Sequence, residues 1–244
     1  MKHREYRHLV DGAETAILFI HGINGTPNHF NRFLPLVPDH ISVLNLLLDG
    51  HGGDVKDFSR TSMQKWEAQV QRAVDELSLT HKQIFITAHS MGTLFAIEQA
   101  IKNRKIAALF LLSVPIRVRI KGKMLVNTWK ICCGRIKPGD RVAEAAKHCC
   151  GIRLSKNPFL YVGWIPRYLE LFAKIRRIRA DLSLLQTSCT AYQSRQDELV
   201  SVHSIPYLKE HSRVSVVELK HSGHFFYDDE DYAALLKAFA NMLG

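Results

Sequence analysis

A serine directly after an apolar stretch is the first candidate for chemistry in this chain. Ser90 follows the apolar run 84–88, and Gly92 and a helical pattern over 93–102 come next. A buried strand that ends at a serine and passes at once into a helix lifts the hydroxyl clear of the backbone. The helix N-terminus supplies free N–H groups and a positive dipole end, which favour a developing negative charge. The pattern predicts a nucleophile that needs a base, an acid and oxyanion donors from the rest of the chain.

Three further polar stretches stand shortly after other apolar runs. They are the His21-Gly22 loop, Asp197 and His224. Because the carboxyl ends of parallel strands meet at one edge of a sheet, we expect these stretches and Ser90 to converge there. The serine, aspartate and histidine would then lie close enough to act on one another.

The spacing of apolar residues predicts the elements that position this site. Short continuous apolar runs are typical of parallel strands that are buried on both faces. We expect such strands at 15–20, 41–48, 84–88, 107–114, 188–193 and 213–219, with a short edge strand at 5–10. Helices are expected at 28–36, 63–77, 93–102 and from 228 onward. The fold class is α/β, with a mostly parallel central sheet and helices on both faces.

The alternation of strands and helices breaks down over residues 115–180. This segment holds sixteen Lys/Arg and three Asp/Glu, a balance of +13 in a chain of net charge +10. We interpret 1–114 and 181–244 as the core and 115–180 as a basic, helical lid, because an insertion after a strand's carboxyl end lies over the site. The alternative is a solvated basic face without a partner.

The motifs together resemble the α/β-hydrolase superfamily, and more narrowly the small bacterial carboxylesterases and monoacylglycerol lipases. The resemblance rests on HGINGTPNHF, DGHGGD, AHSMG, SRQDELV and HSGHFFYDD, and on the chain order serine, aspartate, histidine. It covers the core on both sides of the insertion and is weakest within 115–180. Ala88 departs from the usual Gly-x-Ser-x-Gly pattern, but this change removes no catalytic atom.

The resemblance implies a role for each site residue. Ser90 would attack an acyl carbonyl, and His224 would take the serine proton as general base and later return it. Asp197 would hold the imidazole in the useful tautomer and stabilise its protonated form. The backbone N–H groups of Ile23 and Met91 would form the oxyanion hole.

Several of these assignments have competitors. Glu198 adjoins Asp197 and could be the acid, and His221 lies three residues before His224 and could be the base. His51 could border a substrate pocket or be a plain turn residue. We expect His89, beside the serine, to pack under the turn, so that its mutation disturbs folding more than chemistry.

Composition and cysteine spacing indicate where the protein works and which metals, cofactors and partners to expect. The first dozen residues lack an apolar signal core, and five cysteines without a secretion signal indicate reduced thiols, so we expect a cytoplasmic protein. The adjacent pairs Cys132-Cys133 and Cys149-Cys150 do not have zinc-site spacing. We expect no metal, no cofactor and no nucleic-acid partner. The basic insertion could contact an anionic membrane surface peripherally.

The sequence therefore favours a serine hydrolase that cleaves carboxylic esters through an acyl-enzyme, with monoacylglycerols or short- to medium-chain acyl esters as substrates. A first alternative is an acyl-CoA thioesterase whose basic lid holds phosphates. A second is a non-catalytic binding protein on a hydrolase scaffold, because a fold alone does not establish function.

Overall fold

A seven-stranded sheet forms the centre of the protein. The computed structural model describes residues 3–119 and 121–244, without the side chains of 123–125 and 127. The strands are β1 (Tyr6–His8), β2 (Thr15–Ile20), β3 (Ser42–Asn45), β4 (Gln83–His89), β5 (Ile106–Leu112), β6 (Ser188–Ser194) and β7 (Val214–Leu219). Their order across the sheet is β1-β3-β2-β4-β5-β6-β7. Only β1 pairs antiparallel within this sheet, so the expected mostly parallel α/β fold is confirmed.

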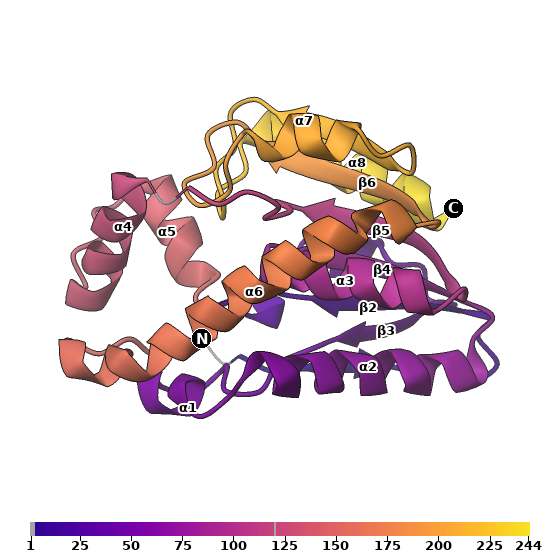
Figure 1. The fold of residues 1–244 in the computed structure, drawn as a ribbon, viewed down its shortest axis with the longest axis horizontal. Coiled ribbons are helices and arrows are strands. Elements are labelled where there is room, and N and C mark those ends of the chain that lie inside the picture. Colours follow the sequence, from indigo (N-terminus) through magenta and orange to yellow (C-terminus); the bar gives the residue numbers. More distant parts are fainter. Residues whose placement is uncertain (1–2, 120) are drawn as a thin grey trace.

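Helices cover both faces of this sheet (Figure 1). The α-helices are α1 (Val55–Ser59), α2 (Met63–Thr80), α3 (Met91–Lys102), α4 (Gly122–Cys133), α5 (Arg141–His148), α6 (Ile165–Asp181), α7 (Ser204–Lys209) and α8 (Asp229–Leu243). The 3₁₀ helices are η1 (Pro27–Phe30), η2 (Leu34–Leu36), η3 (Pro158–Trp164) and η4 (Leu182–Leu184).

The two cores on either side of the sheet follow from the alternation of side chains along β2. Leu18 and Ile20 belong to the core under α2, α3 and α6, whereas Phe19 packs with Phe30 and Phe239 on the side of α8. All five of these side chains are fully buried. Successive residues of a strand point to opposite faces, so one apolar run serves both cores and anchors the central strands.

One expected helix differs in kind from the prediction. Residues 28–36 form the two short 3₁₀ helices η1 and η2, each with a proline in its first turn, Pro27 and Pro35. A proline within a longer helix would remove a backbone donor and clash with the preceding turn. The second proline therefore divides the apolar pattern into two short turns.

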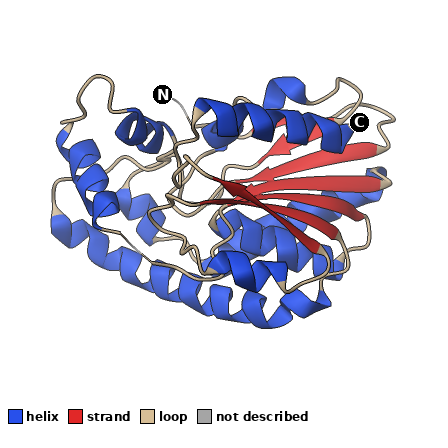
Figure 2. Cartoon of the chain, turned by 90° about the horizontal axis from the view of Figure 1, so that it is seen from above, coloured by secondary structure: helices blue, strands red, loops and turns tan. Residues whose placement is uncertain are grey.

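The inserted segment contains the helices α4, α5, η3 and α6 and no strand of the sheet among its described residues. α4 and α5 lie beyond the carboxyl ends of the strands, and α6 begins at that end and runs back along the sheet (Figures 1 and 2). Leu171, Ile175 and Ile178 of α6 join the core under α2 and α3. The last part of the segment is thus core structure.

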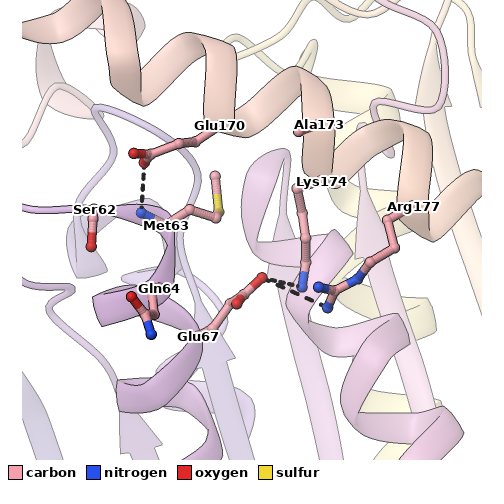
Figure 3. A pocket seen from close by; sticks show the side chains of 8 residues that line it. All are labelled: Ser62, Met63, Gln64, Glu67, Glu170, Ala173, Lys174 and Arg177. Carbon is pink, nitrogen blue, oxygen red and sulfur yellow. Dashed lines mark hydrogen bonds and ion pairs between the residues drawn. The ribbon is translucent and has the colours of Figure 1, made fainter.

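A buried ion-pair cluster fixes α6 to the core. The Lys174 side chain is 1% exposed and forms ion pairs with Glu67 of α2 and Glu98 of α3. Arg177 pairs with the same two carboxylates, and Glu170 accepts a hydrogen bond from the backbone N–H of Met63 (Figure 3). Lys174 therefore does not belong to a solvated basic face, because its charge is compensated inside the protein.

No helix within the described ranges 3–119 and 121–244 combines the length and apolar character needed to cross a bilayer.

Candidate active site

Ser90 occupies a strained turn between β4 and α3. Its backbone has φ 51° and ψ −122°, a combination that a residue with a side chain rarely adopts. Backbone strain of this kind costs on the order of 1–3 kcal/mol and is found mainly at functional sites. Thr93 binds the Ser90 carbonyl through its backbone N–H and its hydroxyl, at 2.9 and 2.6 Å, which stabilises the turn.

Two glycines allow this turn to pack closely against the end of β2. A Cβ atom on Gly92 would lie 2.2 Å from the carbonyl oxygen of Ile20, and one on Gly22 would lie 2.9 Å from Cβ of Ser90. Neither position tolerates a side chain without a backbone shift. Ala88 is different, because it lies within β4, is fully buried and pairs in register with Ile20, so its methyl group fits the sheet.

The structure brings His224 and Asp197 together. Nδ1 of His224 lies 2.9 and 3.0 Å from the two carboxylate oxygens of Asp197, and both side chains are nearly inaccessible to solvent. Asp197 also accepts hydrogen bonds from the backbone N–H groups of Leu199 and Val200. A carboxylate held in this way fixes the proton of the neutral imidazole on Nδ1 and leaves Nε2 as the basic nitrogen.

Asp197 carries its negative charge in spite of its burial. Desolvation raises the pKa of this carboxyl, but the neighbouring imidazole and the hydrogen bonds from His224, Val200 and Leu199 together outweigh it, so the pKa lies below its ordinary value. The site therefore holds an ionised acceptor beside the imidazole at neutral pH.

The two competing residues take other positions. Glu198 Oε2 accepts the backbone N–H of His224 at 2.8 Å, so this carboxylate holds the main chain and not the ring. A Cβ on Gly223 would lie 3.0 Å from both Glu198 carboxylate oxygens, which shows how closely the loop packs on Glu198. His221 is exposed, and its backbone N–H donates to Asp231.

His89 connects the serine turn to His224. Its Nε2 donates to the carbonyl oxygen of His224 at 3.0 Å. Its ring stacks on that of His29 at 4.0 Å between centroids and lies 4.7 Å from that of His224. Desolvation lowers the pKa of His89 far below its ordinary value, so the ring is neutral at physiological pH. His29 could not be predicted as part of this site, because nothing in the sequence around it separates it from the other histidines.

No hydrogen bond joins Ser90 Oγ to the His224 ring among the described residues. His89 is the residue before Ser90, and its hydrogen bond to the His224 carbonyl holds the His224 backbone beside the serine turn. In hydrolases without substrate, such contacts are often long and tighten on binding.

The backbone donors expected at Ile23 and Met91 are available. Met91 is the first residue of α3, where an N–H has no partner within the helix. In the described part of the chain neither N–H donates to another backbone group. Ile23 lies in the loop next to Gly22, which approaches Ser90, so both donors lie beside the serine turn.

The insertion is tied to the loop that contains Ile23. Asn24 has φ 56°, and its side-chain amide donates to the hydroxyl of Tyr168 on α6 at 2.7 Å. The Asn24 carbonyl accepts the backbone N–H of Gly151 at 2.8 Å. These contacts had no signal in the sequence, because they join residues more than 120 positions apart in a region without regular strand spacing.

His51 packs in an aromatic cluster. Its ring contacts His21, Phe58 and Trp66 at centroid distances of 4.7 to 5.5 Å, and its Nδ1 lies 3.1 Å from the carbonyl of Leu48. Desolvation lowers its pKa to about 4. Its Nε2 is buried and has no partner in the described protein. A role in substrate binding stays a prediction.

The cysteines do not form a disulfide, and all five are free. In the described parts of the chain, no group of three or more His, Cys, Asp or Glu side chains is arranged to hold a metal ion. The described site combines a strained turn at Ser90 with an aspartate–histidine pair, and a hydrogen bond from His89 to the His224 carbonyl joins the two.

Comparison with known proteins identifies the family of the chain. Residues 17–238 match the model of the alpha/beta hydrolase family. The chain belongs to this family. In alpha/beta hydrolases the nucleophile lies on a strand-to-helix turn, which is where Ser90 lies in this member. A search of curated protein sequences finds no match.

Solved structures of other alpha/beta hydrolases have the same fold along nearly the whole chain. One of the metagenome-derived lipolytic enzymes LipS and LipT is 16% identical with a TM-score of 0.74, and covers 99% of this chain and 97% of its own. The Paleococcus ferrophilus monoacylglycerol lipase is 18% identical with a TM-score of 0.67, covering 100% and 98%. A carboxylesterase of the thaumarchaeon Nitrososphaera gargenis is 15% identical with a TM-score of 0.68, covering 98% and 94%.

Proposed function

We propose that this alpha/beta hydrolase is a serine hydrolase that cleaves carboxylic esters through an acyl-enzyme. The observation that carries the proposal is the strained turn at Ser90, which His89 joins to the backbone of His224, whose imidazole is paired with a buried, ionised Asp197. Similar solved structures include lipolytic enzymes, a monoacylglycerol lipase and a carboxylesterase, which supports the same chemistry.

In the proposed first step, Ser90 Oγ attacks the ester carbonyl carbon while Nε2 of His224 takes the hydroxyl proton. Asp197 stabilises the imidazolium that forms. The tetrahedral intermediate then collapses, the bond to the alcohol oxygen breaks, and His224 returns the proton to that oxygen. In the second step a water molecule, activated by the same imidazole, cleaves the acyl-enzyme and releases the acid.

The negative charge of the tetrahedral intermediate would be bound by the N–H groups of Ile23 and Met91. Both lack a competing backbone acceptor in the described part of the chain, so they are free to donate to the oxyanion. Loss of one such donor typically costs about 3 kcal/mol of transition-state stabilisation. The hydrogen bond from Asn24 to Tyr168 supports the loop in which Ile23 lies.

A fluorophosphonate probe tests the nucleophile. We expect the wild-type protein to be labelled at Ser90 and Ser90→Ala to remain unlabelled. Ser113→Ala is a matched control, because Ser113 also has a positive φ, of 54°, and is buried. Labelling of Ser90→Ala at the wild-type rate, or no labelling of a folded wild-type protein, contradicts the proposal and favours a non-catalytic binding protein.

The favoured substrates are monoacylglycerols and short- to medium-chain acyl esters. The rival class is acyl-CoA thioesters, whose phosphates would meet the basic insertion. Rates with p-nitrophenyl esters, monoacylglycerols and acyl-CoAs of several chain lengths separate the two. A higher kcat/KM for acyl-CoA that falls when insertion arginines are neutralised identifies a thioesterase instead.

The insertion also carries a surface suited to a membrane. Along η3 and α6, the exposed apolar side chains Phe159, Val162, Ile165, Leu169 and Phe172 recur every three or four residues. Phe159 is 81% and Leu169 is 62% exposed. Exposed cations of the same segment, among them Lys156 and Arg176, complement anionic lipid. We propose that this stripe contacts an anionic bilayer without crossing it.

Co-sedimentation with vesicles tests the membrane contact. We expect binding to phosphatidylcholine vesicles that contain phosphatidylserine, and weaker binding to pure phosphatidylcholine. Leu169→Glu should weaken it, whereas Leu79→Glu, at an 85% exposed leucine of α2, should not. No binding to either type of vesicle rules out this contact.

The five free cysteines support our proposal that the protein works in the reducing cytoplasm.

A further inference from the structure

A large cavity lies outside the candidate active site, under α4 and α5. It has a volume of about 870 Å³ and is bounded by these helices and by the backbone segments 52–53 and 150–154. Ser90, Asp197 and His224 do not line it. Sites for small ligands in proteins are typically about 300–1,000 Å³, so this cavity has the size of a ligand site.

One wall of the cavity is a backbone segment that also contacts the loop beside the serine turn. Gly151 donates its N–H to Asn24 and accepts the N–H of Gly52 at 2.7 Å, and Arg153 donates to Gly53 at 2.9 Å. A Cβ on Gly151 would lie 1.9 Å from the carbonyl oxygen of Gly25, so the segment fits tightly. Residues 151–153 thus form a fixed partition between the cavity and the loop that contains Ile23.

Four aliphatic side chains line the cavity beside its polar residues. Ile131 comes from α4, Ile136 from the turn after it, and Ile152 and Leu154 from the partition side. Ile152 is 4% exposed, whereas the other three are partly exposed and available to a ligand. Among the described lining residues there is no Phe, Tyr or Trp, and the aromatic rings are the imidazoles of His3 and His148. These walls suit an aliphatic chain.

Cations stand at the rim of the same cavity. Lys147 of α5 and Arg153 are exposed lining residues, and within the described residues neither forms an ion pair. Glu144 is the one carboxylate of the lining and is also outside any ion pair there. Asp54 is close to Arg153, but its carboxylate accepts the N–H groups of Lys56 and Asp57 as the cap of α1. The two cations are therefore free to bind an anion.

We propose that this cavity binds a single-chain anionic amphiphile, with its acid group at Lys147 and Arg153 and its aliphatic chain against Ile131, Ile136 and Leu154. A neutral lipid would leave the two cations without a partner, and a cationic one would be repelled. The acid group is a carboxylate or a phosphate monoester, because both present anionic oxygen acceptors to the two cations. The binding does not depend on the ester hydrolysis proposed above.

Calorimetric titration of the full chain tests the charge selectivity, below the critical micelle concentration of each probe. The probes are dodecanoate, dodecyl phosphate, dodecyl maltoside and dodecyltrimethylammonium. We expect both anions to bind, and the neutral and cationic probes to bind at least about tenfold more weakly. A preference for dodecanoate or for the phosphate identifies the acid group. Equal binding of the anionic and cationic probes overturns the proposal.

Variants then locate the site. Arg153→Gln and Lys147→Gln should each weaken dodecanoate binding about tenfold, because each removes a charged donor. Lys156→Gln is the matched control, since Lys156 is an exposed cation of the same insertion outside the lining. Ile136→Asn should weaken binding of dodecanoate more than that of hexanoate. Unchanged affinity in both Arg153→Gln and Lys147→Gln overturns the site.

Hydrolysis of p-nitrophenyl butyrate keeps this result separate from the proposed function. None of the three cavity variants alters a residue of the candidate active site, so we expect their rates to stay within about twofold of wild type. Binding that survives in Ser90→Ala while hydrolysis is lost shows that the two sites are independent.

Discussion

Two groups of buried ionisable side chains lie along α3, one at its N-terminus around His224 and the other along its body around Lys174. Histidine rings dominate the first group, in which His29 stacks on His89 and the His224 ring lies tilted against His89. A lysine between two carboxylates dominates the second. Both groups are withdrawn from water, and desolvation penalises charge in both.

The two groups respond to this penalty in opposite ways. Desolvation lowers the pKa of His29 to about 3, so the ring gives up its proton and needs no counter-ion. Desolvation also lowers the pKa of Lys174, but Glu67 opposes it, and the ammonium group stays paired. His29 and His89 are therefore uncharged at neutral pH, whereas Lys174 keeps its charge between two carboxylates. The first group meets the cost of burial by losing charge, and the second meets it by pairing charges across three helices.

The largest expected effect of a single change belongs to Asp197. Asp197→Asn cannot stabilise the imidazolium and favours the wrong tautomer, so we expect kcat/KM for p-nitrophenyl butyrate to fall about 10⁴-fold. Glu198→Gln is the matched control, because a glutamine oxygen can still accept the His224 backbone N–H. In Glu198→Gln, kcat/KM should fall at most about tenfold. The reverse order of losses would make Glu198 the acid.

A change in the lysine group should act on stability and leave catalysis intact. Lys174→Met leaves Glu67 and Glu98 short of a buried partner, so the free energy of unfolding should fall by about 3 kcal/mol in urea titrations. Its kcat should stay within about twofold of wild type. Lys82→Ala, at the exposed pair with Glu14, should change stability by less than about 1 kcal/mol.

The double variant Lys174→Met with Glu67→Gln sharpens this result. Because the two side chains form an ion pair at 2.6 Å, their effects should not add, and the double variant should lose less than the sum of the singles. Additive losses would mean that the pair does not stabilise the fold. A large loss of kcat in Lys174→Met would remove the contrast between the two groups.

The smallest expected effect is a dependence of stability on pH. Desolvation lowers the pKa of His51 in the folded protein to about 4, against about 6.5 in the unfolded chain. The unfolded state therefore binds the extra proton as pH falls below about 6.5, and stability declines down to about pH 4. One such histidine accounts for about 1.4 kcal/mol between pH 7.5 and 5.5.

Urea unfolding at these two pH values measures this contribution. His51→Asn should reduce the loss of stability between pH 7.5 and 5.5 by about 1.4 kcal/mol, and His29→Asn should act in the same direction. His221→Asn is the control, because His221 is exposed. An unchanged pH dependence in both buried variants would show that these histidines are not kept neutral by the fold.

The sequence contains enough information to predict the sheet and the convergence of the site. Apolar runs locate the central strands to within a few residues, because strands buried on both faces leave a continuous signal. The convergence of Asp197 and His224 follows from parallel strands whose carboxyl ends share one edge. The prediction for 28–36 was wrong, because its helical spacing was given more weight than Pro35.

The environment of the site could not be predicted in the same way. The stack of His29 on His89 and the hydrogen bond from the His224 backbone N–H to Glu198 depend on how loops pack, and no periodicity in the sequence indicates this. The burial of Lys174 was hidden by its basic neighbours on α6, since its partners Glu67 and Glu98 lie 107 and 76 positions away. A role of 115–180 as a lid stays a prediction.

The hydrogen bond between Asn24 and Tyr168 bears on how such a protein can change during evolution. Together with the bond from Gly151 to the Asn24 carbonyl, it joins the insertion to the loop beside the serine. The insertion therefore cannot be exchanged between proteins as an independent unit. A chimera that received the corresponding segment of a relative would lose both supports of Asn24 unless they were carried over. A replacement segment that keeps these two contacts would retain the support of the loop that contains Ile23.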